Sequence, residues 1–150
     1  MLYKEDIIKT LKAMNLPSQE YWITSGAALV IHGVKETTRD IDLGCTSILI
    51  EKFIKEGCKY RLVEDNSRIV EVTDKIELLE NWFVDEIIFI KNLPVASLES
   101  IKKQKSQLGR EKDLIDIKLI DDYIKNNILI KVNVALITSD TSTFKMLNHY

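Results

Sequence analysis

The chain has 150 residues, of which 45% are hydrophobic, and this is the size of one globular domain with a core of its own. Its 21 basic and 23 acidic residues leave a formal net charge of −2, which excludes a protein whose whole surface attracts nucleic acid or an anionic membrane. The charged N-terminus and the lack of a membrane-length apolar run predict a soluble, cytoplasmic protein with no membrane segment.

The chain begins with a predicted amphipathic helix and a strand that ends in a tight turn. Residues 2–14 place apolar side chains close to a helical repeat, which stops before Pro17. Residues 21–24 are strand formers, and Ser25-Gly26 turns the chain into a short apolar helix over residues 27–32. The order strand, turn, buried short helix is therefore predicted for this stretch.

Strands dominate the middle of the chain. Residues 40–44 alternate charged and apolar side chains, as a half-buried strand does, and a helix over residues 48–56 is expected to follow. Three further strand candidates are separated by turn residues and are expected to pair antiparallel: residues 59–63, 68–73 and 75–79.

The last third of the chain predicts one more strand and two helices. The strand covers residues 86–90, and the helices cover residues 98–108 and 111–124. Residues 128–137 form an apolar run rich in β-forming side chains, which predicts a further extended segment before a mostly polar end.

Helices and strands are mixed without a strict alternation, which predicts an α+β domain with a mixed β-sheet flanked by helices. We assign residues 1–125 to this domain and residues 126–150 to a C-terminal tail. The apolar run in the tail is expected either to pack on the same domain or to form an interface, with a homodimer as one alternative.

Two acidic residues separated by one apolar residue follow the Ser25-Gly26 turn. Residues i and i+2 of a strand point to the same face, so Asp40 and Asp42 are expected side by side, with Cα atoms roughly 6 to 7 Å apart. Two neighbouring anions repel each other unless water, a basic side chain or a cation compensates them. Mg²⁺ is usually held by one or two carboxylates together with substrate phosphates.

The turn supplies the complementary half of such a site. A turn that leads into a helix N-terminus presents free N–H groups that suit a phosphate. Gly26 would let the phosphate approach the backbone closely, and the hydroxyl of Ser25 could add a hydrogen bond. The alternative is that Asp40 and Asp42 are two solvated charges at a sheet edge or strand end. Without the preceding turn, this alternative would be the better interpretation of the two aspartates.

The two motifs together resemble those of the nucleotidyltransferase superfamily with the polymerase-β-like fold. The similarity is to small bacterial members related to lincosamide nucleotidyltransferases and to AbiE-type toxin enzymes, in which a Gly-[Gly/Ser] turn precedes an Asp-apolar-[Asp/Glu] motif. Ser25-Gly26 is separated by 13 residues from Asp40-Ile41-Asp42 and fits this spacing, although Ser25 stands where a glycine is usual.

The resemblance implies a third carboxylate on a neighbouring strand. Glu77 is our candidate because its apolar neighbours repeat the setting of Asp42, and Glu71 is the competing choice. Together with Asp40 and Asp42, Glu77 would form the catalytic set and would bind Mg²⁺ or Mn²⁺.

A second region of resemblance lies in residues 98–120. Lys105 and the Arg-x-Lys-Asp-x-x-Asp pattern that starts at Arg110 are similar to a helical segment of the small nucleotidyltransferases. The basic residues of this region form a local cationic cluster that can neutralise phosphate. The implied nucleotide-binding residues are Ser25, Gly26, Arg39 and Lys105.

The implied activity is transfer of a nucleoside monophosphate from a nucleoside triphosphate, with ATP as the expected donor, to an acceptor hydroxyl with release of pyrophosphate. The acceptor is left open among a small molecule, RNA and a protein. The alternative is a non-catalytic or weakly active nucleotide-binding module in a toxin–antitoxin or other two-protein system. A structural domain with coincidental motifs is the third interpretation.

Overall fold

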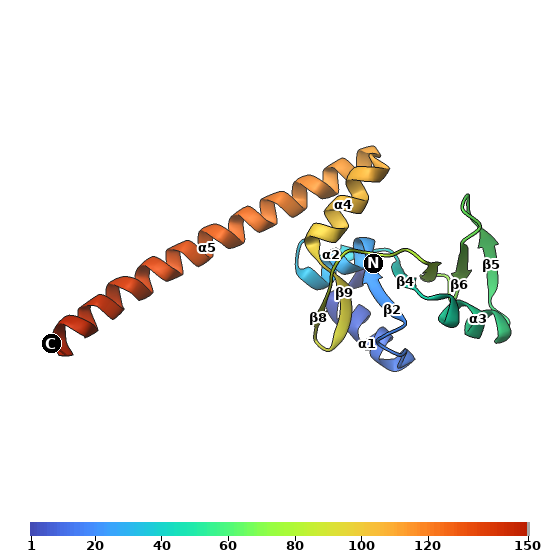
Figure 1. Ribbon diagram of the computed structural model, residues 1–150, viewed down its shortest axis with the longest axis horizontal. Helices are drawn as coiled ribbons and strands as arrows, with labels where there is room; N and C mark the ends of the chain where they lie inside the picture. The colour runs from blue at the N-terminus through green and yellow to red at the C-terminus, as the bar shows by residue number, and fades with distance from the viewer. Residues whose placement is uncertain (150) are drawn as a thin grey trace.

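The body of the protein is a seven-stranded mixed β-sheet, in a computed structural model that describes the backbone of residues 1–149 and the side chains of residues 1–138 (Figure 1). The seven strands are β2 (Tyr21–Thr24), β4 (Ile41–Cys45), β5 (Lys59–Leu62), β6 (Arg68–Glu71), β7 (Ile76–Glu80), β8 (Ile87–Ile90) and β9 (Leu93–Ala96). They follow the order β5-β6-β7-β4-β2-β9-β8. The predicted α+β class with a mixed sheet is confirmed.

Strand register at the centre of the sheet brings distant segments together. Strand β4 pairs antiparallel with β2 and parallel with β7, so Asp42 lies opposite Thr24 on one side and Glu77 on the other. Strands β5, β6 and β7 form an antiparallel meander, which confirms the pairing expected for residues 59–79.

Five helices accompany the sheet: α1 (Lys4–Met14), α2 (Ser25–His32), α3 (Ser47–Lys55), α4 (Leu98–Leu108) and α5 (Glu111–His149). The apolar core unites α1, α2 and α3 with one face of the sheet, where Ile23, Leu43 and Leu78 are fully buried. Because side chains alternate along a strand, Asp42 and its cross-strand neighbours point to the opposite face. Asp42, Glu77 and Thr24 therefore lie on the face of the sheet opposite the apolar core.

Three strands were not expected: β1, β3 and β9. Residues Leu2–Tyr3 form β1 and pair with β3 (Thr37–Thr38) in a separate two-stranded sheet, so the first helix starts later than predicted. Strand β9 was missed because it contains Pro94, which has no backbone N–H to donate. Its pairing with β2 has its register at Val95, the residue after the proline.

The prediction of an extended segment at residues 128–137 was wrong. This segment belongs to α5, which runs away from the sheet as one long helix (Figure 1). No proline or glycine occurs between residues 111 and 149, so no residue of these types breaks the propagating helix. The apolar side chains of Ile128 and Leu136 are exposed, and the role assigned to the tail stays a prediction. Neither this helix nor any other in the described part of the chain is long and apolar enough to cross a membrane.

The indole of Trp22 packs directly over Gly44 on the site face of the sheet. A Cβ atom added at Gly44 would lie 2.0 Å from the indole nitrogen. Trp22 is 5% exposed, and its indole donates a hydrogen bond of 2.9 Å to the carbonyl of Trp82 and stacks on Phe83 with ring centroids 5.7 Å apart. The glycine is thus required by the position of one aromatic side chain.

We expect Gly44→Ala to lower the free energy of unfolding by ~1–3 kcal/mol, because the added methyl group overpacks the contact with Trp22. Urea unfolding would measure the loss. In a Trp22→Val background the same substitution should cost clearly less, since the obstructing ring is gone. Equal costs in the two backgrounds would contradict the assignment of the clash to Trp22.

Candidate active site

Asp42 is the centre of an acidic cluster at the start of β4. The parallel register sets it beside Glu77, whose side chain points to the same face of the sheet. Burial, and then the charges of Glu77 and Asp40, raise the pKa of Asp42 to about 6, while Lys112 and Lys105 act in the opposite direction. The carboxylate therefore lies among more negative than positive charge.

Asp40 and Glu77, both predicted site residues, border one cavity. Asp40 precedes β4 and is exposed, whereas Asp42 within the strand is half-buried. The cavity has a volume of about 310 Å³, and its lining residues are Asp40, Glu71, Thr73, Asp74, Lys75 and Glu77. Four of these six side chains are acidic, so the space beside Asp40 and Glu77 is suited to a cation or to a group that donates hydrogen bonds.

The predicted turn lies against the segment that carries Asp40. A Cβ atom at Gly26 would lie 2.7 Å from the hydroxyl oxygen of Thr38, two residues before Asp40. Ser25 has a φ of 54°, a left-handed conformation that glycine adopts freely and that costs serine about 1 kcal/mol or more. A glycine would adopt this conformation without strain, which gives a physical reason for the glycine expected at this position of the Gly-[Gly/Ser] motif. The turn opens α2, whose first amide groups have no acceptor within the helix.

Arg61 on the edge strand β5 connects both candidates for the third acid. Its Nη1 donates to Glu77 at 2.8 Å and lies 3.4 Å from Glu71. Glu77 is adjacent to Asp42, while Glu71 lies opposite Glu77 and one strand farther away. The register thus sets Glu77, and not Glu71, next to Asp42. Nothing in the sequence indicates Arg61, because its contact with Glu77 crosses an intervening strand.

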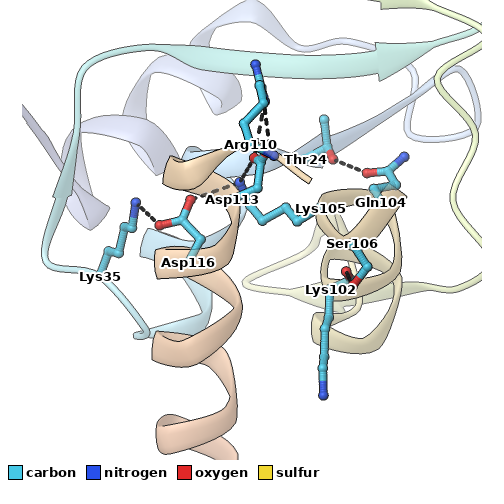
Figure 2. A network of polar contacts seen from close by, with 9 residues as sticks. All are labelled: Thr24, Lys35, Lys102, Gln104, Lys105, Ser106, Arg110, Asp113 and Asp116. Atoms are coloured by element: carbon cyan, nitrogen blue, oxygen red, sulfur yellow. Dashed lines mark hydrogen bonds and ion pairs between the residues drawn. The ribbon is translucent and has the colours of Figure 1, made fainter. Parts of the chain in front are cut away.

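Lys105 lies in a buried ion network that joins α4 to α5 (Figure 2). Its Nζ is 2.9 Å from Asp116 and 3.6 Å from Asp113, and Asp113 is completely buried. Arg110 donates to Asp113 at 2.6 Å, and Lys35 contacts Asp116 at 2.6 Å. The pattern from Lys105 to Asp116 that the sequence singled out therefore forms one network.

The pKa values of the two acids reflect these contacts. Hydrogen bonds from Arg110 hold the pKa of Asp113 below its ordinary value. Burial alone would raise the pKa of Asp116, but Lys35 and Lys105 together lower it. The ammonium group of Lys105 is thus ion-paired at the junction of α4 and α5. Its charge still opposes the rise in the pKa of Asp42. Of the other predicted residues, Arg39 is exposed next to Asp40.

Gln104 links α4 to the strand beside Asp42, and nothing in the sequence indicates this contact. The hydroxyl of Thr24 lies 3.3 Å from the amide oxygen of Gln104, whose amide nitrogen donates to the carbonyl of Phe83 at 3.1 Å. Because Thr24 lies opposite Asp42 in β4, this contact holds α4 close to the acidic cluster.

We expect Asp42→Asn to stabilise the metal-free protein at neutral pH. The pKa of Asp42 is about 6 in the folded protein and 3.8 as its ordinary value, so the folded state binds the extra proton between these values. The contribution of Asp42 to the free energy of unfolding therefore falls as the pH rises from about 4 to 7. The variant should exceed the wild type by ~1–2 kcal/mol at pH 7, allowing for partial exposure.

Urea unfolding in the presence of a chelator would measure this difference, and it should shrink as the pH is lowered toward 4. A variant that is less stable than the wild type at pH 7, or a difference that does not change with pH, would contradict this account of Asp42.

Lys105→Met should destabilise the protein by ~1–3 kcal/mol, because it removes a cation shared by two buried acids. The loss is smaller than for a fully orphaned pair because Arg110 and Lys35 remain. Lys102→Met is the matched control, since Lys102 pairs with Asp121 between the same two helices but at the surface. Thermal unfolding of both variants tests this. Equal losses of stability would show that the buried network stabilises the protein no more than the surface ion pair does.

Comparison with known proteins bears on the fold. No family model matches the chain, and no curated protein matches its sequence. A similar solved structure is that of ANT(2")-Ia, an aminoglycoside nucleotidyltransferase, in complex with adenylyl-2"-tobramycin. The TM-score is 0.51 and the identity 17%, over 87% of this chain and 92% of that chain. At this identity the likeness establishes architecture, and the chain has the polymerase-β-like nucleotidyltransferase fold.

Proposed function

We propose that the protein is a metal-dependent nucleotidyltransferase. It would transfer a nucleoside monophosphate from a nucleoside triphosphate, with ATP as the expected donor, to an acceptor hydroxyl and release pyrophosphate. The observation that carries the proposal is the register that sets Asp42 beside Glu77 and opposite Thr24, the residue before the Ser25-Gly26 turn. The fold likeness supports nucleotidyl transfer in general terms.

The acidic cluster fits a divalent cation that binds together with a nucleotide. Within the part of the chain that the structure describes, no three His, Cys, Asp or Glu side chains are arranged to hold a metal ion alone. Mg²⁺ needs fewer protein ligands when phosphates complete its shell, and Asp40 with Asp42 meets that need. The raised pKa of Asp42, due to burial and neighbouring acids, marks an anion that a cation would stabilise.

Asp40, Asp42 and, as the third acid, Glu77 would therefore hold Mg²⁺ or Mn²⁺ together with the phosphates of the nucleotide. When bound, such an ion lowers the negative charge on the attacked phosphate and stabilises the leaving oxygen. Glu77 would accept the proton of the acceptor hydroxyl as a general base. The cavity of about 310 Å³ beside Glu77 offers the acceptor space next to this carboxylate.

The turn before α2 would bind the triphosphate. The first backbone N–H groups of α2, at Ser25 and Gly26, have no acceptor within the helix, and an anion is favoured at such a helix N-terminus. Arg39 is exposed next to Asp40 and could donate to a phosphate oxygen. Lys105 would contribute through its charge, since its ammonium group is bound to Asp116. The acceptor is a small molecule, RNA or a protein.

The second candidate function is a nucleotide-binding module with little or no turnover, acting in a toxin–antitoxin or other two-protein system. The contact between Arg61 and Glu77 favours it, because a carboxylate held by a guanidinium group is a poorer base. Turnover with an acceptor separates the two candidates.

We expect Asp40→Asn to remove metal-dependent nucleotide binding while the metal-free protein keeps or gains stability. In the wild type, free nucleotide at about 100 times its Kd should add ~2.7 kcal/mol and raise the unfolding midpoint by several degrees. Thermal unfolding with and without Mg²⁺ and each of the four nucleoside triphosphates measures the effect. Asp122→Asn, an exposed acid on α5, is the control and should behave like the wild type.

A wild type that shows no midpoint shift with any nucleoside triphosphate would contradict the proposal. A shift without pyrophosphate release across candidate acceptors would favour the binding module.

A further inference from the structure

We infer that Arg61 is the internal counter-ion of the acidic cluster, and that a metal ion must displace it from Glu77. Arg61 would thus be a positioning residue that makes metal binding depend on nucleotide binding. This inference rests on the proposed function, because it assigns Glu77 a place at a metal site.

Three acids lie in one row across three neighbouring strands. Asp42 of β4 is in register with Glu77 of β7, and Glu77 is in register with Glu71 of β6. Like charges directly opposite each other destabilise a sheet, so such a row needs compensating positive charge. Arg61 provides it by contacting both glutamates, at 2.8 Å and 3.4 Å.

Arg61 reaches Glu77 from two strands away. Strand β6 separates β5 from β7, so the two backbones are roughly 9 to 10 Å apart and the arginine, which lies opposite Ile69, must extend across β6. A long flexible side chain on an edge strand can leave this position without disturbing the sheet. The side chain is 51% exposed, and an exposed ion pair of this kind is weak and screened by salt.

Arg68, a second arginine in the same meander, makes a buried contact with several hydrogen bonds, and it serves as a comparison for Arg61. Arg68 donates three hydrogen bonds to Glu80, two from its side chain and one from its backbone. The side chain of Glu80 is only 7% exposed, and hydrogen bonds from Arg68 lower its pKa to about 2. The contact of Arg61 with Glu77 has neither this burial nor this number of bonds, which is consistent with a releasable pair.

The charges of these groups couple the binding of the metal to the binding of the nucleotide. A divalent cation between Asp42 and Glu77 would repel the guanidinium group, so the two cations compete for the same carboxylate. A triphosphate supplies new anionic oxygens, to which a released arginine can donate. Metal alone should therefore bind weakly, and metal with nucleotide should bind with positive coupling.

The experiment measures Mn²⁺ binding to the metal-free protein by electron paramagnetic resonance of free Mn²⁺. Each titration is run with and without a non-hydrolysable ATP analogue. The variants are Arg61→Gln, Arg61→Lys and the matched control Lys59→Gln, which removes one charge from the same strand. Lys59 lies opposite Glu71 in register and tests whether any nearby positive charge would serve.

Arg61→Gln should bind Mn²⁺ alone about fivefold more tightly than the wild type, and the nucleotide should then enhance Mn²⁺ binding by a correspondingly smaller factor. Arg61→Lys should lie close to the wild type, and Lys59→Gln should change the affinity less than twofold. Loss of folding cannot produce this result, because a damaged site would bind the metal more weakly.

Unchanged or weaker Mn²⁺ binding by Arg61→Gln, in a protein whose wild type binds Mn²⁺ with nucleotide, would overturn the counter-ion role and leave the proposed function standing. An equal gain in Lys59→Gln would also overturn it, since the effect would then be general electrostatics. Absence of Mn²⁺ binding to the wild type, even with nucleotide, would overturn both the inference and the proposed function.

Discussion

Repulsion among carboxylates in register is the constraint on which the account of this protein depends. Asp42 and Glu77 are adjacent because β4 and β7 run parallel, and Glu71 extends the row by one strand. Each added acid raises the cost of keeping the others charged, and the pKa of Asp42 responds by rising to about 6, chiefly through burial. A sheet that maintains such a row needs cations nearby, from its own side chains or from a ligand.

The surrounding structure supplies these cations from two directions. On the side of the meander, Arg61 extends from the edge strand to Glu77. On the side of the helices, Lys105 and Lys112 lower the pKa of Asp42, and Asp113 and Asp116 hold Lys105 in place. The helix junction in Figure 2 therefore fixes positive charge near the acids as well as joining α4 to α5.

Local patterns in the sequence were sufficient to predict the strand and the helix that carry the candidate site. The alternation around Asp42 predicted a strand, which the structure contains. Ser25 and Gly26 predicted a turn before a helix over residues 27–32, and the helix is present but begins at Ser25, so these two residues form its first turn. The choice of Glu77 followed from its resemblance to the setting of Asp42, and its catalytic role stays a proposal. These features depend on neighbours within a few residues along the chain, which a single sequence displays directly.

Long-range pairing and competing propensities account for what was missed. Arg61 meets Glu77 only because three strands fold into a meander, and sequence spacing gives no measure of that contact. Strand β9 was not predicted because it contains Pro94. The continuation of α5 was not predicted because residues near Ile128 are β-forming, and there helix propagation outweighed the local preference. Gly26 was expected to leave room for a phosphate, yet the nearest group to its missing Cβ is the hydroxyl of Thr38.

The most direct test of the central claim maps where a paramagnetic cation binds. Backbone amide spectra of the protein would be recorded while Mn²⁺ is added in small amounts together with a non-hydrolysable ATP analogue. Broadening should appear first at residues 40–42, at Glu77 and at residues 24–26, because the proposed cation and triphosphate would lie between these segments. Broadening that begins elsewhere, or that is uniform over the chain, would contradict a metal site at the paired carboxylates.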